Sequence, residues 1–318
     1  MSSINKHFNA ADYIRAFASL MVAIYHLGGK TQPILNYSWL GVQMFFVLSG
    51  FIICYTLPKD YNYKQSHTFL LKRIIRINFP YFCSILIIIF INFISRNTNA
   101  IDWENIGLHL LYLNQYFDKP YLNPVYWTLA VEFQFYILIA IFFPIITKNI
   151  GLFVICTANI ITVIYRIESV AIFNFLPLFS LGILGFKFIQ EEKNLRTTLI
   201  VSILIIASCS VLSLGWLQSI TGFLTFAVLF APLPKLSVIT FFSKISFSLY
   251  LVHDVVGSRL VVYLGKYFPT ELYYKALIFL IGLSVSIITA WFFYKIIEKP
   301  FMKWSKSIKY GPKNYALN

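Results

Sequence analysis

Long hydrophobic runs separated by short polar stretches follow one another along most of this chain. Most runs are roughly 20 residues long, which is the length that an α-helix needs to cross ~30 Å of hydrocarbon. Stretches such as 84-SILIIIFINFI-94 show no alternation of polar and apolar residues, which argues against the strands of a membrane β-barrel. Lipid offers no hydrogen-bond partners, so each run must satisfy its own backbone, as a helix does. The pattern predicts an all-α, polytopic integral membrane protein.

About ten transmembrane helices are predicted from the positions of these runs. The predicted spans are 12–28, 38–57, 78–95, 127–147, 150–165, 171–189, 198–214, 217–233, 243–264 and 274–297. The longest segment between spans, about 96–126, is too short for a core of its own, although helical spacing in 105–117 predicts an interfacial helix. The first span has no small-residue cleavage site, so we expect it to be retained. Residues 1–318 are expected to form a single membrane-embedded domain with no fused soluble domain.

Composition agrees with a membrane location, because 58% of the residues are hydrophobic and only 12% are charged. With the amino terminus inside, 19 of the 26 Lys and Arg residues lie on the inner side, as the positive-inside rule requires. Both termini are therefore expected in the cytoplasm. The net charge of +14 is spread over separate inner segments, which favours anionic lipid over nucleic acid as a partner. The four cysteines lie in predicted spans without ligand spacing, so neither a metal nor a disulfide is indicated.

The first span carries Asp12, Arg15 and His26, and charged groups inside membrane spans mark function by default. The spacing of Arg15 and His26 places both on one helical stripe, about 16 Å apart. Asp12 precedes Arg15 by one helical turn and can pair with it. The alternative is that Arg15 extends toward the inner surface while His26 hydrogen-bonds a neighbouring helix.

Arg73 and Arg76, at the inner end of the third span, are expected to project the same way. Paired guanidinium groups match the oxygens of a phosphate, and the alternative is ordinary anchoring at the inner surface. In the fourth span, Glu132 lies at a depth similar to that of His26, which permits a histidine–carboxylate pair. A carboxylate that only packs helices is the alternative.

Small and hydroxylated residues mark two further spans. Gly41, Ser49 and Gly50 interrupt an otherwise bulky stretch and predict a close approach between helices. The stretch 246-SFSLYLVHD-254 contains hydroxyl groups and His253, and its residue types alone assign it no catalytic role.

Together these segments resemble the bacterial membrane-bound acyltransferase 3 family over the whole chain. The motifs that carry the resemblance are Asp12-x-x-Arg15 with His26 further on; Phe45-Phe46-x-x-Ser49-Gly50-Phe51; Arg73-x-x-Arg76 before Pro80; Trp127-x-Leu129-x-x-Glu132-x-x-x-Tyr136; the stretch from Ser248 to His253; and Glu298-x-Pro300. Thr128 stands where the family usually has Ser, and Asp254 and Val255 stand where a more apolar run is expected. Each motif is loose, but their order and spacing are specific.

The resemblance implies an O-acyltransferase that moves an acyl group from cytoplasmic acyl-CoA to a hydroxyl of a cell-surface or lipid-linked glycan. The expected group is acetyl, with succinyl as an alternative, and the acceptor would be a polysaccharide, a lipopolysaccharide O-antigen or a lipid-linked sugar. Acetyl-CoA is then a co-substrate, and no bound cofactor is expected. The expected location is the bacterial plasma (inner) membrane.

Within this reading His26 is the general base, since a neutral histidine suits proton abstraction near neutral pH. Glu132 would orient its ring, as the carboxylate of a catalytic triad does. A transient acyl-histidine is the alternative route. The residues expected to place the donor are Arg15, Arg73 and Arg76, and those expected to support the site are Asp12, Ser49, Tyr136 and His253.

A transporter or flippase of lipid-linked glycan intermediates is the competing function. It would account for charges inside the membrane, but not for paired arginines together with an Arg–His stripe. A polysaccharide polymerase would be expected to have a large, charged outer loop. The outer aromatic residues are expected to form either a sugar-stacking surface or an interfacial belt; they are Trp103, Tyr112, Tyr116 and Trp127.

Overall fold

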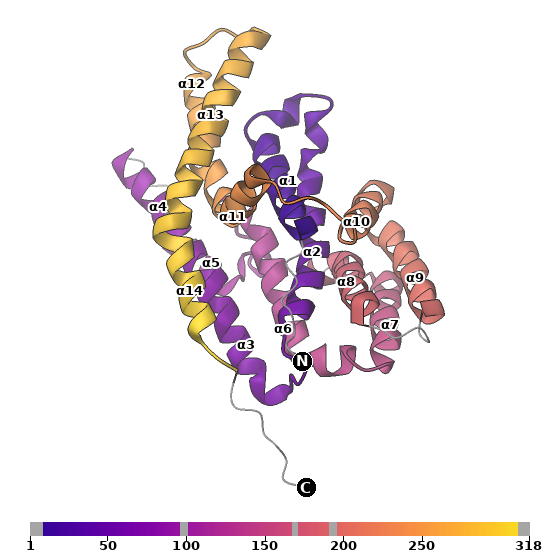
Figure 1. The fold of residues 1–318 in the computed structure, drawn as a ribbon. Coiled ribbons are helices and arrows are strands. Elements are labelled where there is room, and N and C mark those ends of the chain that lie inside the picture. Colours follow the sequence, from indigo (N-terminus) through magenta and orange to yellow (C-terminus); the bar gives the residue numbers. More distant parts are fainter. Residues whose placement is uncertain (1–8, 96–100, 167–170, 191–195, 311–318) are drawn as a thin grey trace. The chain divides into compact units, whose positions relative to one another are not determined.

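The computed structural model describes residues 9–95, 101–166, 171–190 and 196–310, which form helices and loops without a β-strand among them (Figure 1). The helices are α1 (Asn9–His26), α2 (Gly41–Thr56), α3 (Ser66–Arg73), α4 (Phe79–Ile94), α5 (Trp103–Leu111), α6 (Tyr126–Ile146), α7 (Ile150–Tyr165), α8 (Ala171–Gln190), α9 (Arg196–Leu214), α10 (Trp216–Val228), α11 (Ser237–Val252), α12 (Arg259–Leu264), α13 (Leu272–Phe293) and α14 (Lys299–Ser307). The charge count above also includes Lys6, Arg96, Lys193 and Lys313, which lie outside the described residues.

Each of the ten predicted spans falls on one of these helices or on helices that continue into one another. Within the described residues, seven stretches are long and apolar enough to cross a membrane: Leu35–Thr56, Tyr63–Ile94, Tyr126–Ile146, Ala171–Gln190, Arg196–Leu214, Ser237–Leu264 and Leu272–Ser307. The shorter apolar helices α7 and α10 match two further predicted spans, and α1 matches the first. The prediction of an all-α, polytopic membrane protein is confirmed.

Three of the long stretches contain a π-helical turn, in which the backbone hydrogen bonds run from residue i to residue i+5. These turns are η4 (Ile74–Asn78), η8 (His253–Ser258) and η9 (Tyr294–Glu298). Pro80 and Pro300 lie in the first turns of α4 and α14, directly after η4 and η9. A proline donates no backbone hydrogen bond and crowds the carbonyl four residues before it, and the wider turn relieves that crowding.

The described chain divides into two compact units, each assembled from three separate segments. The first unit contains the described residues within 1–21, 40–61 and 142–244, and the second contains those within 22–39, 62–141 and 245–318. Both units draw on early and late parts of the chain, so neither is a contiguous fused domain. The expectation of a single membrane-embedded domain remains a prediction.

In the first unit, α2 and α8 approach each other at two glycines. A Cβ atom on Gly50 would lie 2.1 Å from the Phe179 carbonyl oxygen, and one on Gly182 would lie 2.1 Å from the Val47 carbonyl oxygen. Only glycine allows two backbones to come this close. The predicted close approach at Gly50 is confirmed.

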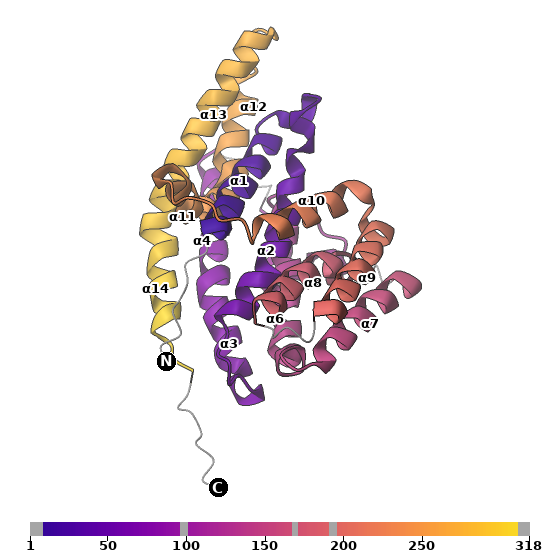
Figure 2. The same ribbon diagram turned by 45° about the vertical axis from the view of Figure 1, so that its right-hand side comes forward.

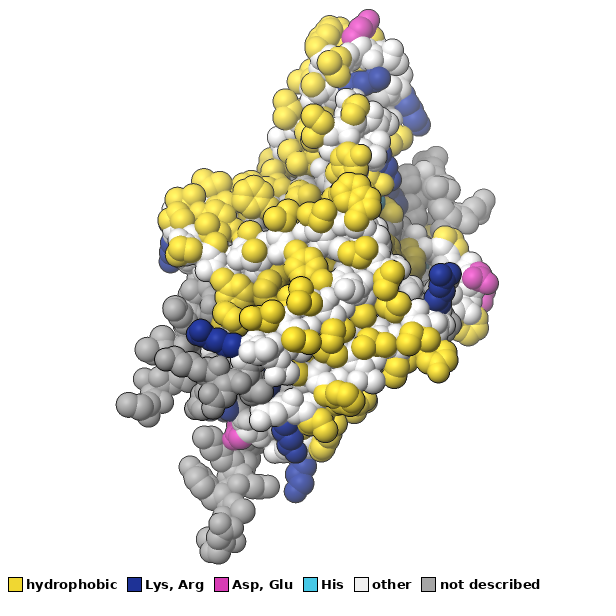
Figure 3. All heavy atoms as spheres, turned by 90° about the vertical axis from the view of Figure 1, so that its right-hand side faces the viewer, with side chains coloured by type: hydrophobic (Ala, Val, Ile, Leu, Met, Phe, Trp, Pro, Cys, Tyr) yellow, Lys and Arg dark blue, Asp and Glu magenta, His cyan; other side chains and the backbone are white. Residues whose placement is uncertain are grey.

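The outer surface of the first unit is apolar, as contact with lipid requires. Hydrophobic side chains spread over the face formed by α7, α9 and α10 (Figure 3), among them Phe153, Leu212, Trp216 and Leu224. Polar groups instead face inward and pair between helices. The Asn159 amide, for example, donates to the Ser180 hydroxyl at 2.9 Å. Apolar side chains on the outer face, with polar side chains paired between helices, are typical of a helical membrane protein.

In the second unit, α3 lies beside α14, and α12 lies beside α13 (Figures 1 and 2). The Lys72 ammonium, at the end of α3, donates to the carbonyl oxygens of Ser305 and Ile308. The Ser305 hydroxyl donates back to the Lys72 carbonyl at 2.8 Å. These reciprocal bonds fix the end of the chain that the structure describes against α3.

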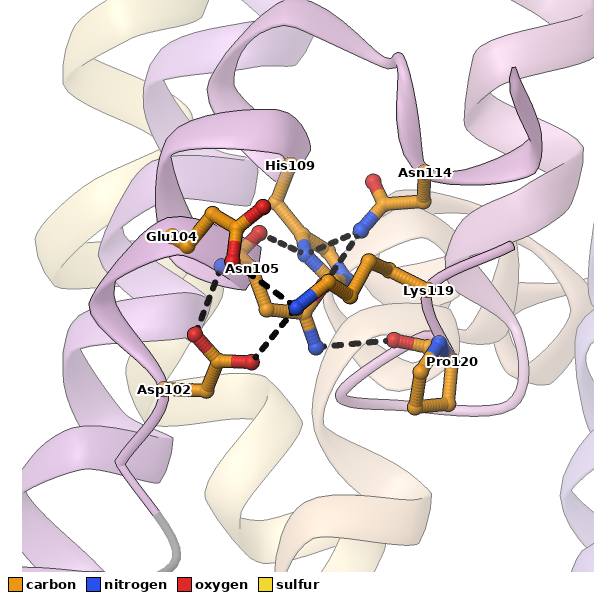
Figure 4. A network of polar contacts seen from close by, with 7 residues as sticks. All are labelled: Asp102, Glu104, Asn105, His109, Asn114, Lys119 and Pro120. Carbon is orange, nitrogen blue, oxygen red and sulfur yellow. Dashed lines mark hydrogen bonds and ion pairs between the residues drawn. The ribbon is translucent and has the colours of Figure 1, made fainter. Parts of the chain in front are cut away.

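A polar network holds the segment between α4 and α6 in the second unit (Figure 4). The ring of His109 is fully buried and accepts the Leu122 N–H at Nε2, so Nδ1 carries the proton and donates to the Asn105 carbonyl at 2.8 Å. The Asn105 amide donates to the Pro120 carbonyl at 3.0 Å. Burial lowers the pKa of His109. This loop is therefore built around a neutral histidine.

Ion pairs connect the two ends of the same loop on its exposed side. The Lys119 ammonium donates to Glu104 at 2.9 Å and to Asp102 at 3.4 Å. The Asn105 backbone N–H, which donates to Asp102 at the start of α5, lowers the pKa of that carboxyl. Asp102 is the amino-terminal cap of α5. The helix expected within 105–117 is present, and it begins slightly earlier, at Trp103.

Candidate active site

The π turn η8 brings two side chains to the imidazole of His26, the last residue of α1. The ring centroids of His26 and His253 lie 5.4 Å apart, and His26 Nδ1 lies 3.9 Å from Asp254 Oδ1. The Ser258 hydroxyl donates to the His26 carbonyl at 3.2 Å. Residues four or five apart share a face of a π turn, so His253, Asp254 and Ser258 reach the end of α1 together.

A glycine allows this close packing. A Cβ atom on Gly257 would lie 2.0 Å from the Ser286 hydroxyl oxygen and 2.8 Å from a methyl carbon of Leu27. Leu27 directly follows His26, so the bare backbone at Gly257 lets η8 settle against the end of α1. The sequence contains this glycine, but its partners are far away in the chain.

The ring of His26 is mostly enclosed, with 11% of its side chain exposed. It packs edge-on against Tyr25, whose ring also carries the Lys30 ammonium at 5.2 Å. Among the residues that the structure describes, Asp254 supplies the carboxylate within ion-pair distance of His26. The expected partner was Glu132, which the structure does not bring into direct contact with this ring.

His253 is fully buried, and one of its two ring nitrogens has a hydrogen-bond partner. Its Nδ1 lies 2.9 Å from the Leu249 carbonyl, one turn earlier in α11, and therefore carries a proton. Its Nε2 has no hydrogen-bond partner among the described residues. An imidazole held in this tautomer presents a buried lone pair at Nε2.

Glu132 belongs to a second group of residues in the same unit. It lies one turn before Tyr136 on α6 and hydrogen-bonds the phenol of that residue. The guanidinium carbon of Arg73 lies 5.7 Å from the centroid of the Tyr136 ring and 5.2 Å from that of Phe69. Glu132 thus supports the arginine stack.

The basic residues before α4 differ in their surroundings. Lys72 is bonded to the segment around α14, and Arg73 stacks on Phe69 and Tyr136. Arg76 is half-buried and has neither a hydrogen bond nor an ion pair among the described residues. The expectation that Arg73 and Arg76 project the same way assumed α-helical spacing, whereas the π turn η4 begins between them. The two guanidinium groups therefore differ in their contacts.

Hydrogen bonds between α6 and α11 hold these groups in place. The Thr128 and Tyr250 hydroxyls share a hydrogen bond of 2.5 Å, and both lie within hydrogen-bond distance of the Val125 carbonyl, at 2.8 and 3.3 Å. The Asn123 amide donates to the Leu251 carbonyl at 3.2 Å. A serine hydroxyl at position 128 could make the same contacts.

Asp12, Arg15 and Ser49 belong to the first unit, whereas the residues just described belong to the second. The Asp12 carboxylate accepts a hydrogen bond of 2.6 Å from Ser243, a partner that helical spacing could not reveal. Arg15 and Ser49 are half-buried. Helix α1 runs unbroken from Asn9 to His26, as the predicted Arg15–His26 stripe requires.

One member of the predicted sugar-stacking surface is buried. Tyr112 is 5% exposed, and its ring stacks on Tyr81 and Phe133 with centroid distances of 5.3 and 5.2 Å. The reason is its left-handed backbone conformation after α5, which turns the ring inward. Trp103 and Tyr116 are exposed and remain available to a ligand or to the membrane interface.

Two proteins from Staphylococcus aureus show what this chain is similar to. O-acetyltransferase OatA of strain NCTC 8325 / PS 47 is 31% identical over 158 residues, which cover 44% of this chain and 25% of OatA. SACOL0978 of strain COL, whose name assigns it provisionally to the O-acetyltransferases, is 24% identical over 372 aligned positions. That match covers 94% of this chain and 58% of the relative. The chain thus spans about a quarter of OatA and just over half of SACOL0978, and no solved structure matches it.

The family match covers nearly all of the chain. The model of the acyltransferase domain, acyltransferase 3, matches residues 8–295. This range includes both histidines of the cluster, both arginines before α4, and Glu132. The chain therefore belongs to the acyltransferase 3 family.

Proposed function

We propose that this protein is a membrane O-acyltransferase that moves an acetyl group from acetyl-CoA to a hydroxyl of a cell-surface or lipid-linked glycan. The observation that carries the proposal is the enclosed His26 ring, with Asp254 beside Nδ1, in a chain of the acyltransferase 3 family. The names of the two relatives supply the acetyl group and the O-linkage. A flippase needs no such histidine.

His26 is the general base of the proposed reaction. Its Nε2 takes the proton of the acceptor hydroxyl while the hydroxyl oxygen forms a bond to the thioester carbonyl carbon. The C–S bond then breaks, and the CoA thiolate leaves with the proton returned from the imidazolium. Such proton transfer typically contributes about 10²–10⁴-fold to the rate.

Arg76 receives a phosphate of the donor in this proposal. A half-buried guanidinium without a protein partner supports this role, because an uncompensated charge is costly inside a membrane span. Arg73 and Glu132 support it from the neighbouring stack. Arg15 and Ser49 would assist placement of the donor, and Asp12 would support Arg15.

The charge distribution supports an orientation in the bacterial plasma membrane with both termini in the cytoplasm and Arg76 on the donor side. Single cysteines in a cysteine-free parent test it. An impermeant maleimide added outside intact cells should label Asp118→Cys and Glu271→Cys, both exposed. It should leave Asn62→Cys and Lys309→Cys, also exposed in the structure, unlabelled. The reverse pattern would remove the cytoplasmic donor from the proposal.

His26 variants test the reaction itself. His26→Gln keeps hydrogen-bonding capacity and most of the volume but cannot act as a base. Membrane vesicles with radiolabelled acetyl-CoA should show loss of label in the envelope glycan by about 10²-fold or more. The matched control is His67→Gln, because His67 is exposed and outside the cluster. Near wild-type labelling by His26→Gln at normal protein levels would overturn the assignment.

A further inference from the structure

We propose that Asp254 is the positioning carboxylate of His26: it holds the Nδ1–H side of the ring, leaves Nε2 to face the acceptor, and stabilises the imidazolium that forms during transfer. This inference rests on the proposed role of His26 as the base. It assigns to Asp254 the part that sequence alone gave to Glu132.

Geometry selects Asp254 among the neighbours of His26. Its carboxylate lies 3.9 Å from Nδ1, which is outside hydrogen-bond length but within ion-pair range. Catalytic hydrogen bonds in ligand-free enzymes are often long and tighten only in the reactive complex. Glu132 hydrogen-bonds Tyr136, and His253 donates its Nδ1–H to the Leu249 carbonyl.

The surroundings of Asp254 point the same way. Its side chain is 23% exposed and has no hydrogen bond or further ion pair among the described residues. A carboxylate inside a membrane span costs about 2.5–3.5 kcal/mol on insertion scales, so a structural role without a partner is unfavourable. Within the described residues, His26 is its ion-pair partner, and its charge also acts on the neighbouring His253.

Charge complementarity gives the carboxylate a function during the reaction. When His26 takes the proton from the acceptor hydroxyl, its ring becomes positive close to the Lys30 ammonium, which lies over the adjacent Tyr25 ring. His253 is held neutral and cannot offset that charge. Asp254 is the neighbour of opposite sign, and its attraction to the ring is strongest when the ring is charged.

The backbone adds a separate argument. Asp254 lies in the π turn η8, and such turns are frequent at functional sites. The same turn anchors to α1 through the bond from Ser258 to the His26 carbonyl. The carboxylate and the backbone of His26 are therefore held by one short segment.

Two substitutions separate a charge role from a shape role. Asp254→Asn keeps the shape and loses the charge, whereas Asp254→Glu keeps the charge and changes the length. In membrane vesicles with radiolabelled acetyl-CoA, we expect Asp254→Asn to lower kcat about tenfold or more while the KM for acetyl-CoA stays the same. That loss is smaller than the ~10⁴-fold caused by removing a directly bonded triad carboxylate. Asp254→Glu should recover part of the rate, and Glu271→Gln, which removes an exposed carboxylate, should behave as wild type.

A spectroscopic measurement tests the pair without any substrate. The chain has five histidines, so ¹⁵N NMR of labelled protein in nanodiscs is tractable, with His26 assigned from His26→Gln. We expect the Nδ1–H tautomer in the wild type and a shift toward Nε2–H in Asp254→Ala. Thermal unfolding of each variant confirms that it folds.

The outcomes distinguish this inference from the proposed function. If His26→Gln abolishes transfer while Asp254→Asn matches the wild type and the tautomer is unchanged in Asp254→Ala, the positioning role is wrong and the base remains. If Asp254→Glu is worse than Asp254→Asn, the role is one of shape and the inference fails. If His26→Gln keeps transfer, the proposed function fails first.

Discussion

The Ser248 hydroxyl donates a hydrogen bond of 2.5 Å to the Glu298 carboxylate. Ser248 lies in α11 and is fully buried, and Glu298 ends the π turn η9 and is 9% exposed. Two motifs of the family resemblance, the stretch from Ser248 to His253 and Glu298-x-Pro300, are therefore one contact in space. The contact secures the helix that leads into η8, and so the placement of Asp254.

Ser248→Ala should destabilise the protein, because it leaves a buried carboxylate without this donor. A hydrogen bond to a charged group contributes about 1.5–3 kcal/mol, so the unfolding temperature in detergent should fall by several degrees. Ser208→Ala removes an exposed hydroxyl bonded within its own helix and should have little effect. Equal unfolding temperatures for the two variants would mean that the Ser248–Glu298 bond is not stabilising.

Gly50→Ala should be strongly destabilising, since the new methyl group would meet the Phe179 carbonyl oxygen at 2.1 Å. Overpacking of this kind costs about 1–3 kcal/mol, occasionally more. Gly107→Ala is the matched control, because a Cβ atom there meets nothing within 4 Å. Alanine also favours helix over glycine by about 1 kcal/mol, so this control should be neutral or stabilising. Thermal unfolding of both variants gives the comparison, and a harmless Gly50→Ala would contradict the close α2–α8 packing.

Arg73 and Arg76 should respond differently to replacement by lysine. Arg76→Lys loses no protein contact, so stability should hold while acetyl-CoA affinity, measured by calorimetric titration, falls about tenfold through loss of the forked donors. Arg73→Lys should lower the unfolding temperature, because it weakens the stack on Phe69 and Tyr136 by about 1 kcal/mol. Lys303→Ala, at an exposed position, is the control. Unchanged affinity in Arg76→Lys would restore the anchoring interpretation.

The buried network around His109 should make stability depend on pH. Burial lowers the pKa of His109 in the folded protein, so below its ordinary pKa of about 6.5 the unfolded state binds a proton that the folded state resists. The contribution of the neutral His109 to the free energy of unfolding is complete above the ordinary pKa. It is lost as the pH falls toward the lower pKa of the folded protein. The unfolding temperature should therefore drop between pH 7.5 and 5.5, with a smaller drop in His109→Gln. The control His67→Gln should show the same fall in unfolding temperature as the wild type. If the control also shows a smaller fall, the pH dependence does not come from His109.

Sequence patterns anticipated the helices and the role of Gly50, because hydrophobic length and small residues act locally. They did not anticipate the partner of His26. Depth in the membrane matched Glu132 to His26, but depth does not give the direction in which a side chain points around its helix. Asp254 is far from His26 in the chain, and only the π turn carries it to the ring. Arg76 was expected to share a face with Arg73 on α-helical spacing, which η4 replaces. Tyr112 was expected at the outer surface but is buried. Its left-handed backbone conformation cannot be read from its residue type.

The three π turns also affect how this chain can be altered. Each amounts to one residue more than an α-helix would use over the same rise. Deleting a single residue from η8 would let the segment close into ordinary α-helical turns while α12 keeps nearly the same direction relative to α11. A deletion within α11 itself has no extra residue to remove, so it would rotate everything after it by about 100° relative to everything before it. A library of single-residue deletions should therefore show phase errors within the α-helices, and smaller, local effects at η4, η8 and η9.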